Sequence, residues 1–241
     1  MALHIHQFPC LSDNYGFLLH DDVSGLTASI DTPDGAEIAK QAKGKGWTLS
    51  HIFNTHHHFD HVGGNDMLKA EYGLTIIGPE ADKARIPHID KPVSGGGVFK
   101  FGGHDIHVLH TPGHTTGHCA YYVPDAAAIF VGDTIFALGC GRLFEGTPAQ
   151  MFDSIAKICA LPDDTQIYCA HEYTLSNGKF ALNVDGDNAD LLAYMEDAKT
   201  KRAKNLPTVP TTIAKEKLAN PFVRAKSAEA LGAVRAAKDG F

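Results

Sequence analysis

Short apolar runs separated by turn residues dominate the first two thirds of the chain. The runs at residues 3–8, 15–20 and 26–31 are separated by Asp, Asn, Ser and Gly, as in antiparallel hairpins. Comparable runs predict further strands at 51–54, 74–78, 104–109, 119–123, 127–132 and 166–170. The N-terminal part should therefore be rich in strands.

Helical patterns interrupt these strands. They predict helices over residues 34–44, 62–72 and 148–160, and a glycine stands at or just after the end of the first two. Strands interleaved with helices in this way indicate two packed sheets with helices on the outside.

The strand pattern stops in the last third of the chain. Residues 187–204 and 211–219 predict helices, and Ser227 predicts the N-cap of a final helix. We therefore expect one domain over residues 1–173 and a small all-helical domain over residues 174–241.

The most specific feature is the stretch Thr55-His56-His57-His58-Phe59-Asp60-His61. Histidine seldom clusters for packing reasons, whereas neutral imidazole and carboxylate are ligands that Zn²⁺ and similar dications favour. Because the stretch lies between a strand-like run and Gly63-Gly64, it should form the loop leaving a strand.

This loop can present ligands to two ions. His56 and His58 can reach one ion, while Asp60 and His61 can reach another. The side chain of His57 should point away from its neighbours, so we expect it to be structural. The alternative is a surface cluster of polar residues, which the spacing and the strand context disfavour.

Three other segments place a polar residue after an apolar strand. They carry His114 in a Pro-Gly turn, Asp133 after Gly132, and His171 after Ala170. Catalytic groups often gather at such strand ends, although isolated polar residues there also serve as turn formers.

At this point the chain resembles the metallo-β-lactamase superfamily and, within it, the hydroxyacylglutathione hydrolase (glyoxalase II) family. The first motif indicates the superfamily, and the Gly139-Cys140-Gly141 segment and the C-terminal Arg and Lys indicate the narrower family. The resemblance rests on residues 55–61, 111–118, 132–134, 139–146, 171–173 and 234–239. It implies an αββα sandwich with a helical, substrate-binding C-terminal domain.

The resemblance also implies a binuclear metal site. The first ion would be held by His56, His58 and His114, the second by Asp60, His61 and His171, with Asp133 bridging both. Two divalent ions are expected, zinc before iron or manganese. Asp60 and Asp133 would also be the catalytic residues, because they can orient the attacking hydroxide.

Four residues are implied as substrate contacts: Arg142, Tyr173, Arg235 and Lys238. Arg235 and Lys238 are three residues apart and share a helix face. On the residues alone, a basic helix end complementing the helix dipole is an equal alternative. Many relatives carry Tyr where this chain has Phe144, so one substrate hydrogen bond is not expected here.

The implied reaction is hydrolysis of S-(2-hydroxyacyl)glutathione, typically S-D-lactoylglutathione, to glutathione and D-lactate, the second step of methylglyoxal detoxification. Metal-bound water becomes acidic near neutral pH, and a thiolate leaves without a dedicated general acid, whereas an amine would need one. A lactonase or β-lactamase, a single-iron glutathione persulfide dioxygenase and a non-catalytic metal protein remain alternatives. Cys140 has no base near it in sequence, which disfavours a nucleophilic role.

The composition argues against several functional classes of protein. The formal charge of −7 disfavours nucleic-acid binding, and five cysteines without a Cys-x-x-Cys pair indicate neither a disulfide framework nor a thiolate zinc site. No signal peptide and no apolar run of membrane-spanning length is recognisable. We expect a cytoplasmic monomer that binds a small-molecule thioester and contacts neither membrane nor nucleic acid.

Overall fold

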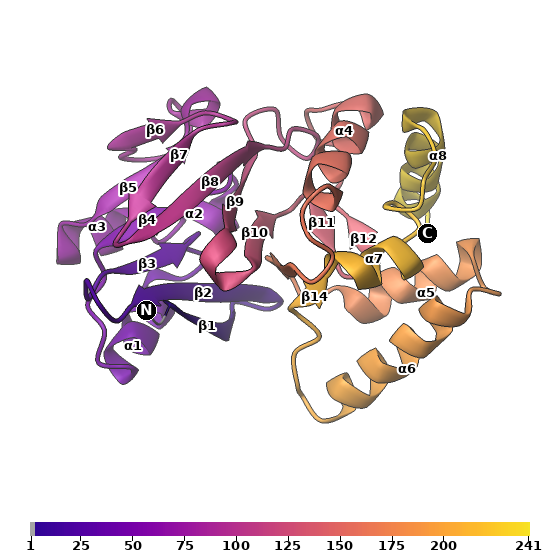
Figure 1. Cartoon of the computed structure of the whole chain (residues 1–241), viewed down its shortest axis with the longest axis horizontal. Helices are drawn as coiled ribbons and strands as arrows, with labels where there is room; N and C mark the ends of the chain where they lie inside the picture. The colour runs from indigo at the N-terminus through magenta and orange to yellow at the C-terminus, as the bar shows by residue number, and fades with distance from the viewer. Residues whose placement is uncertain (1–2) are drawn as a thin grey trace. The chain divides into compact units, whose positions relative to one another are not determined.

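The computed structural model describes residues 3–241, which form two compact units (Figure 1). Unit 1 contains the chain up to His110 together with Gly117–Phe130, and unit 2 contains Thr111–Thr116 and Val131–Phe241. The expected boundary after residue 173 lies inside unit 2, so a separate substrate-binding domain stays a prediction. Within residues 3–241, no helix combines the length and apolar character needed to cross a membrane.

Unit 1 contains two sheets. The first has the strand order β1-β2-β3-β4-β5-β6; its first three strands are antiparallel and the others are parallel. The second is antiparallel and has the order β7-β8-β9-β10 in this unit. The strands are β1 (Leu3–Cys10), β2 (Asn14–Asp21), β3 (Thr27–Ile30), β4 (His51–Phe53), β5 (Thr75–Pro79), β6 (Lys91–Val93), β7 (Val98–Phe101), β8 (His104–His110), β9 (Cys119–Val123) and β10 (Ala128–Gly132). Two short 3-10 helices, η1 (Glu80–Asp82) and η2 (Pro124–Ala126), lie between strands.

Alternating side chains give the first sheet two apolar faces. Ile52 faces a core that includes Ile38 of α1 (Gly35–Gly44) and Leu68 of α3 (Asn65–Tyr72), so these helices cover one face (Figure 1). The next residue, Phe53, points to the opposite face and meets the ring of Phe99 from the second sheet at 5.1 Å between centroids. The period of two along a strand produces this layering.

The prediction of one helix over residues 62–72 is wrong about where the helix begins. The structure has α2 (Phe59–Val62), then two glycines, then α3. A Cβ at Gly64 would lie 2.7 Å from the backbone nitrogen of Gly35, so the chain must pass close to α1 at this point. The glycines allow this approach and separate the two helices.

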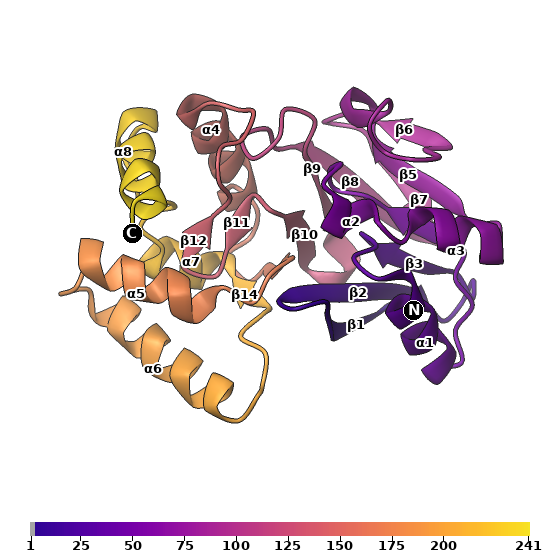
Figure 2. The ribbon, with the colours of Figure 1, turned by 180° about the vertical axis from the view of Figure 1, so that it is seen from behind.

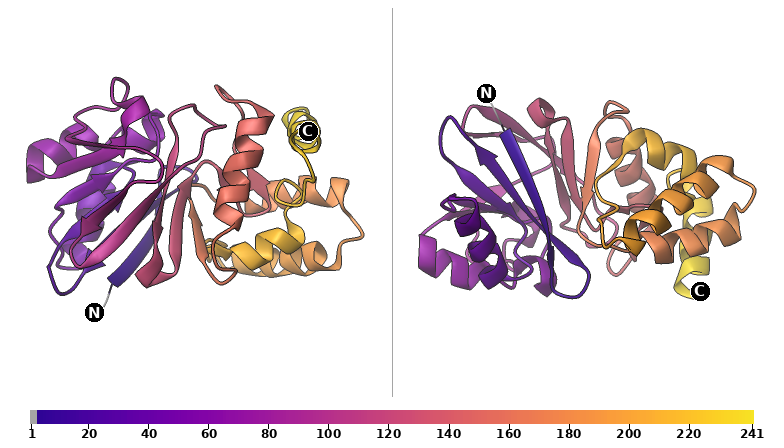
Figure 3. Two further views of the ribbon diagram at one scale, coloured as in Figure 1. Left: turned by 45° about the horizontal axis from the view of Figure 1, so that its top comes forward. Right: turned by 90° about the horizontal axis from the view of Figure 1, so that it is seen from below.

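Unit 2 is mainly helical. It contains the small hairpin β11 (Ile135–Phe136) and β12 (Gly139–Cys140), α4 (Pro148–Cys159), β13 (Gln166–Cys169), α5 (Thr174–Val184), α6 (Ala189–Ala203), β14 (Thr211–Thr212), α7 (Ile213–Ala219) and α8 (Ala228–Asp239). Ser227 caps α8 by accepting a hydrogen bond from the Ala230 backbone, which confirms the predicted start of this helix. Helix α8 packs against α4 (Figure 3).

The apolar pattern does not predict α5, which lies alongside α6 (Figure 2). Its sequence contains Gly178, a poor helix former. A Cβ at Gly178 would overlap with Met195 Sδ of α6. The glycine therefore allows close helix packing, a tertiary requirement that periodicity alone does not reveal.

Candidate metal and substrate-binding site

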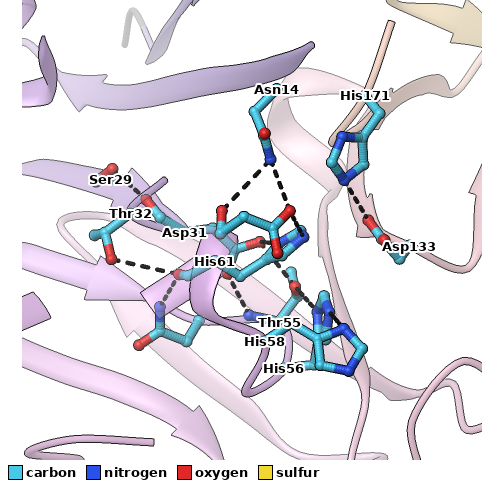
Figure 4. A network of polar contacts seen from close by, with 12 residues as sticks. Asn14, Ser29, Asp31, Thr32, Thr55, His56, His58, His61, Asp133 and His171 are labelled. Carbon is cyan, nitrogen blue, oxygen red and sulfur yellow. Dashed lines mark hydrogen bonds and ion pairs between the residues drawn. The ribbon is translucent and has the colours of Figure 1, made fainter. Parts of the chain in front are cut away.

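The histidine-rich loop follows β4 in unit 1 and runs into α2 (Figure 4). His56 and His61 are buried and His58 is partly buried. The Nε2 atom of His56 lies 3.1 Å from Nδ1 of His58, and the candidate ligand atoms of His56 and His61 lie within 4.8 Å of each other. A stretch of six residues, 56–61, thus brings three imidazoles to one place.

Hydrogen bonds define the orientation of two of these rings. Nδ1 of His61 lies 2.8 Å from Oδ2 of Asp31, and Nδ1 of His56 lies 3.0 Å from Oγ1 of Thr55. The Thr55 hydroxyl in turn donates to Asp31 at 2.8 Å. With both Nδ1 atoms engaged in this way, Nε2 is the nitrogen of each ring that is suited to a metal.

Asp31 was not singled out from the sequence. A usable signal existed. Asp31 follows β3, the parallel neighbour of β4, and Thr55 follows β4, so the carboxyl ends of the two strands meet. The Asp31 carboxylate also accepts from the backbone N–H of Thr55 at 2.7 Å.

Asp60 occupies the first turn of α2. Its Oδ2 accepts a hydrogen bond from Nδ2 of Asn14 at 3.0 Å and lies 3.4 Å from Nε2 of His61. Asn14 stands at the start of β2 and was not singled out from the sequence. It holds the Asp60 carboxylate beside His61.

The remaining histidines around the loop have structural contacts. Nδ1 of His57 lies 3.1 Å from Oδ2 of the fully buried Asp82, which agrees with its expected structural role. The His118 ring is buried and stacks on His56 with 4.9 Å between centroids. His118 therefore supports the His56 ring.

Unit 2 brings together the other three predicted ligands. Nε2 of His114 lies 3.4 Å from Oδ2 of Asp133. Nε2 of His171 lies 3.5 Å from Oδ1 of the same carboxylate (Figure 4). Nδ1 of His114 lies 2.8 Å from the carbonyl oxygen of Arg142 and can donate to it. All three side chains are buried. Each oxygen of Asp133 thus lies near a different histidine.

The donor set fits divalent metal ions. It consists only of imidazole nitrogens and carboxylate oxygens, which zinc, iron and manganese accept. The Nδ1 atoms of His56, His61 and His114 each have an oxygen partner. Such outer partners are a regular feature of metal-binding histidines.

A cavity of about 630 Å³ lies in unit 2 and extends from His114 and Asp133 along the helical region. This volume is in the range of small-molecule sites. All four residues expected to contact substrate line it: Arg142, Tyr173, Arg235 and Lys238. Lys179 and Asp239, which the sequence analysis did not single out, line it as well.

The cationic residues of the cavity differ in exposure. Arg235 is buried and donates from Nη1 to the carbonyl of Cys140 at 2.8 Å and from Nη2 to Asp239 at 2.8 Å. The Arg142 side chain is 61% exposed. Burial, followed by the charges of Arg235 and Arg142, lowers the pKa of Lys238. The cavity thus holds four cationic side chains, Arg142, Lys179, Arg235 and Lys238, beside the two carboxylates Asp133 and Asp239.

Aromatic rings connect the cavity with the predicted ligands. Tyr173 stacks on His171 with 4.7 Å between centroids and an interplanar angle of 1°. Phe144, which lacks the hydroxyl of many relatives, has its ring 5.2 Å from that of His114 and is largely exposed. Both rings line the cavity.

Cys140 does not have the properties of a nucleophile. Its thiol is fully buried, and this burial raises its pKa to about 12, so the thiolate is absent at neutral pH. Its backbone carbonyl accepts from Arg235. The contact of Cys140 with Arg235 is thus made by its backbone and not by its thiol.

Two family models match consecutive parts of the chain. The metallo-beta-lactamase superfamily model matches residues 28–171, and the model of the hydroxyacylglutathione hydrolase C-terminus matches residues 172–241. A hydroxyacylglutathione hydrolase from Maricaulis maris is 56% identical over 91% of this chain and 86% of its own length. One from Brucella ovis is 55% identical over 92% of this chain and 86% of its own length.

A solved structure shows the same fold. The crystal structure of ETHE1 from Myxococcus xanthus matches with a TM-score of 0.74 and 26% identity, over 98% of this chain and 90% of that one. The expected fold class is confirmed: a metallo-β-lactamase-like arrangement of sheets and helices with a helical C-terminal region. The chain therefore belongs to the metallo-β-lactamase superfamily and, within it, to the hydroxyacylglutathione hydrolase family.

Proposed function

We propose that the protein hydrolyses the thioester bond of S-(2-hydroxyacyl)glutathione, with S-D-lactoylglutathione as substrate and glutathione and D-lactate as products. Family membership supports the reaction class. The observation that carries the proposal is the cavity of unit 2. His114 and Asp133 line this cavity together with several cationic side chains. Such a cavity suits an anionic thioester placed next to metal ligands.

We assign seven ligands to two divalent ions. Within unit 1 they are His56, His58, Asp60 and His61; within unit 2 they are His114, Asp133 and His171, with Asp133 as the bridge. Zinc is the first candidate, and iron or manganese would accept the same donors. When bound, the ions would polarise the thioester carbonyl and make water acidic near neutral pH.

The protein side chains have distinct tasks in this reaction. Asp31 orients His61 through a hydrogen bond, and Asn14 orients Asp60 in the same way. His61 and Asp60 would lie beside the reacting carbonyl. Asp60 and Asp133 are the carboxylates placed to orient the attacking water. The glutathione thiol leaves readily as a thiolate because its pKa is near 8.5, so no general acid is assigned.

Substrate binding is assigned to the cavity wall. Arg142, Lys238 and Tyr173 present charge or a ring face to the cavity, and Arg235 contributes from a more buried position. Phe144 would contact the substrate through apolar surface only. We also propose a cytoplasmic monomer, in keeping with the five free cysteines.

The test is hydrolysis of S-D-lactoylglutathione by protein of known metal content, measured beside a simple ester and a β-lactam. We expect turnover of the thioester to exceed that of the other two, and two metal ions per chain. Asp133→Asn should lose metal and nearly all activity, because an amide cannot bridge two dications as a carboxylate does. A fully metallated and fully active Asp133→Asn protein would refute the assignment.

A measurement of oxygen uptake distinguishes the proposed hydrolase from the main alternative, a dioxygenase. A single-iron dioxygenase would consume oxygen and need only one set of ligands, whereas the residues for a second set are present here. Turnover of the thioester without oxygen consumption is the expected result.

A further inference from the structure

Besides the predicted metal ligand Asp133, one further carboxylate lines the unit 2 cavity among its cationic side chains. Arg142, Lys179, Arg235 and Lys238 line this cavity, and so does Asp239. A glutathione thioester carries two carboxylates and one α-ammonium group at neutral pH. The cations can accept the carboxylates, which leaves the purpose of Asp239 to be explained.

Asp239 is the last residue of α8, where a negative charge is unfavourable because the C-terminal end of a helix is itself negative. Two arginines stabilise it there. Nη2 of Arg235 lies 2.8 Å from Oδ1 of Asp239, and Nε of Arg142 lies 3.5 Å from the same oxygen. Because both contacts involve Oδ1 and the side chain is 44% exposed, Oδ2 is accessible to a ligand in the cavity.

Besides any contact with a ligand, Arg235 makes several contacts within the protein. It is buried, it donates to the Cys140 carbonyl and to Asp239, and its guanidinium carbon lies 5.3 Å from the centre of the Phe222 ring. These contacts hold the guanidinium in one orientation. Its clearest effect is to position the Asp239 carboxylate at the cavity wall.

We propose that Asp239 binds the α-ammonium group of the γ-glutamyl residue, while the exposed cations of the cavity bind the carboxylates. This inference rests on the proposed function and adds a specificity determinant to it. The cavity would then select zwitterionic ligands with a free amine. A thioester whose amine is acylated loses the positive charge and would bind weakly.

The experiment measures binding, so that it does not depend on turnover. Isothermal titration calorimetry of the metal-loaded protein compares S-methylglutathione with its N-acetyl derivative. A charge-assisted hydrogen bond at a partly exposed site corresponds to about a tenfold preference for the free amine. Asp239→Asn should reduce this preference severalfold, and Asp239→Glu should restore part of it.

Glu229→Gln is the matched control, because Glu229 lies in the first turn of the same helix and is exposed. It removes the same charge and should retain the wild-type preference. Circular dichroism verifies that each variant is folded. The wild-type comparison of the two ligands needs no variant and tests the inference by itself.

Two results would overturn the inference. One is equal affinity of the wild-type protein for both ligands. The other is an equal gain in affinity for both ligands in Asp239→Asn, which would mean that Asp239 only competes with ligand carboxylates for the arginines. Hydrolysis of S-D-lactoylglutathione is measured separately, so a protein with the amine preference but no thioesterase activity would refute the proposed function and not the role of Asp239.

Discussion

At the scale of single residues, the geometry of the predicted metal site depends on side chains that are not themselves predicted ligands. Asp31 accepts hydrogen bonds from His61, from the Thr55 hydroxyl and from the Thr55 backbone. It thereby defines the ring orientation of one ligand and anchors the start of the ligand loop. A residue of this kind is as important for the geometry as the ligands themselves.

Asp31→Asn tests this role. The amide nitrogen cannot accept a hydrogen bond, so the contact with His61 or with Thr55 is lost, and metal affinity should fall about 10- to 100-fold. Metal content after dialysis against buffered zinc gives the readout. Asp66→Asn, at a side chain that is 75% exposed, is the control and should bind metal as the wild type does. Equal metal content in Asp31→Asn and wild type would contradict the assigned role.

At the scale of elements, helix α8 presents its charged residues to the cavity. Arg235 and Lys238 lie three residues apart on one face, as their spacing predicts, yet their surroundings differ. Arg235 is buried against the β12 strand through the Cys140 carbonyl. The amine of Lys238 lies 5.2 Å from the Phe180 ring centre and 3.2 Å from the Ser176 carbonyl oxygen.

Substitution of these two residues should therefore have different consequences. Arg235→Ala should weaken binding of a glutathione thioester about 10- to 100-fold and also lower the unfolding temperature, because the buried Cys140 carbonyl loses its donor. Lys238→Ala should raise KM for the same substrate with little change in unfolding temperature. Steady-state kinetics and thermal melts measure both effects.

A small thioester without the glutathione carboxylates serves as the control substrate. Both variants should hydrolyse it nearly as well as the wild type at a temperature where they are folded. Equal losses on the two substrates would show that the residues support only the fold.

The β11–β12 hairpin is held by a fully buried carboxylate, Glu216 of α7. Glu216 accepts hydrogen bonds from the Leu138 backbone at 2.9 Å, from Tyr194 at 3.0 Å, from Thr211 at 2.7 Å and from Asn220 at 2.8 Å. Despite these donors, burial raises its pKa above the ordinary value. The folded protein therefore retains the proton at pH values where the unfolded chain has released it.

This shift makes stability depend on pH. Between the ordinary pKa of 4.5 and the raised value, the folded state binds more protons than the unfolded state, so stability falls as pH rises through that window. Glu216→Gln removes this contribution. The unfolding temperature of the wild type relative to Glu216→Gln should thus decline as pH increases from about 4.

Thermal melts over a series of pH values measure that difference. Glu196→Gln, at a side chain that is 73% exposed, should show no such trend relative to the wild type. A difference between wild type and Glu216→Gln that stays constant or grows with pH would contradict the assigned direction of the pKa shift.

At the scale of the whole molecule, metal binding should stabilise the folded chain. Ligands that recognise only the folded state raise its stability by mass action, by about 2.7 kcal/mol at a hundredfold excess over Kd. For a chain of this size that corresponds to a change of roughly 5–10 °C in unfolding temperature. Removal of metal by a chelator should lower the unfolding temperature accordingly.

Calorimetry with and without chelator measures this effect. Asp133→Asn, which lacks the proposed bridge, should show a much smaller response to the chelator. Identical melting of the metal-loaded and chelator-treated wild type would mean that the histidine and aspartate cluster does not hold ions in the folded protein.

Much of this protein could be predicted from the amino-acid sequence alone. Alternating apolar residues defined most strands, Ser227 marked the start of α8, and residues 55–61 indicated metal chemistry through residue type and spacing. These are local properties, because strand periodicity, helix capping and ligand spacing depend on neighbouring residues. The comparisons with relatives confirmed the fold class and the family.

Only the tertiary structure decided which distant side chains meet. The pairing of β3 with β4 places Asp31 beside Thr55, the packing of α5 on α6 makes Gly178 acceptable in a helix, and the cavity wall brings Asp239 to Arg142. Each depends on contacts between segments far apart in the chain, which local periodicity does not encode. For this reason the cluster of histidine and aspartate side chains could be predicted from the sequence, whereas the residues that orient those side chains could not.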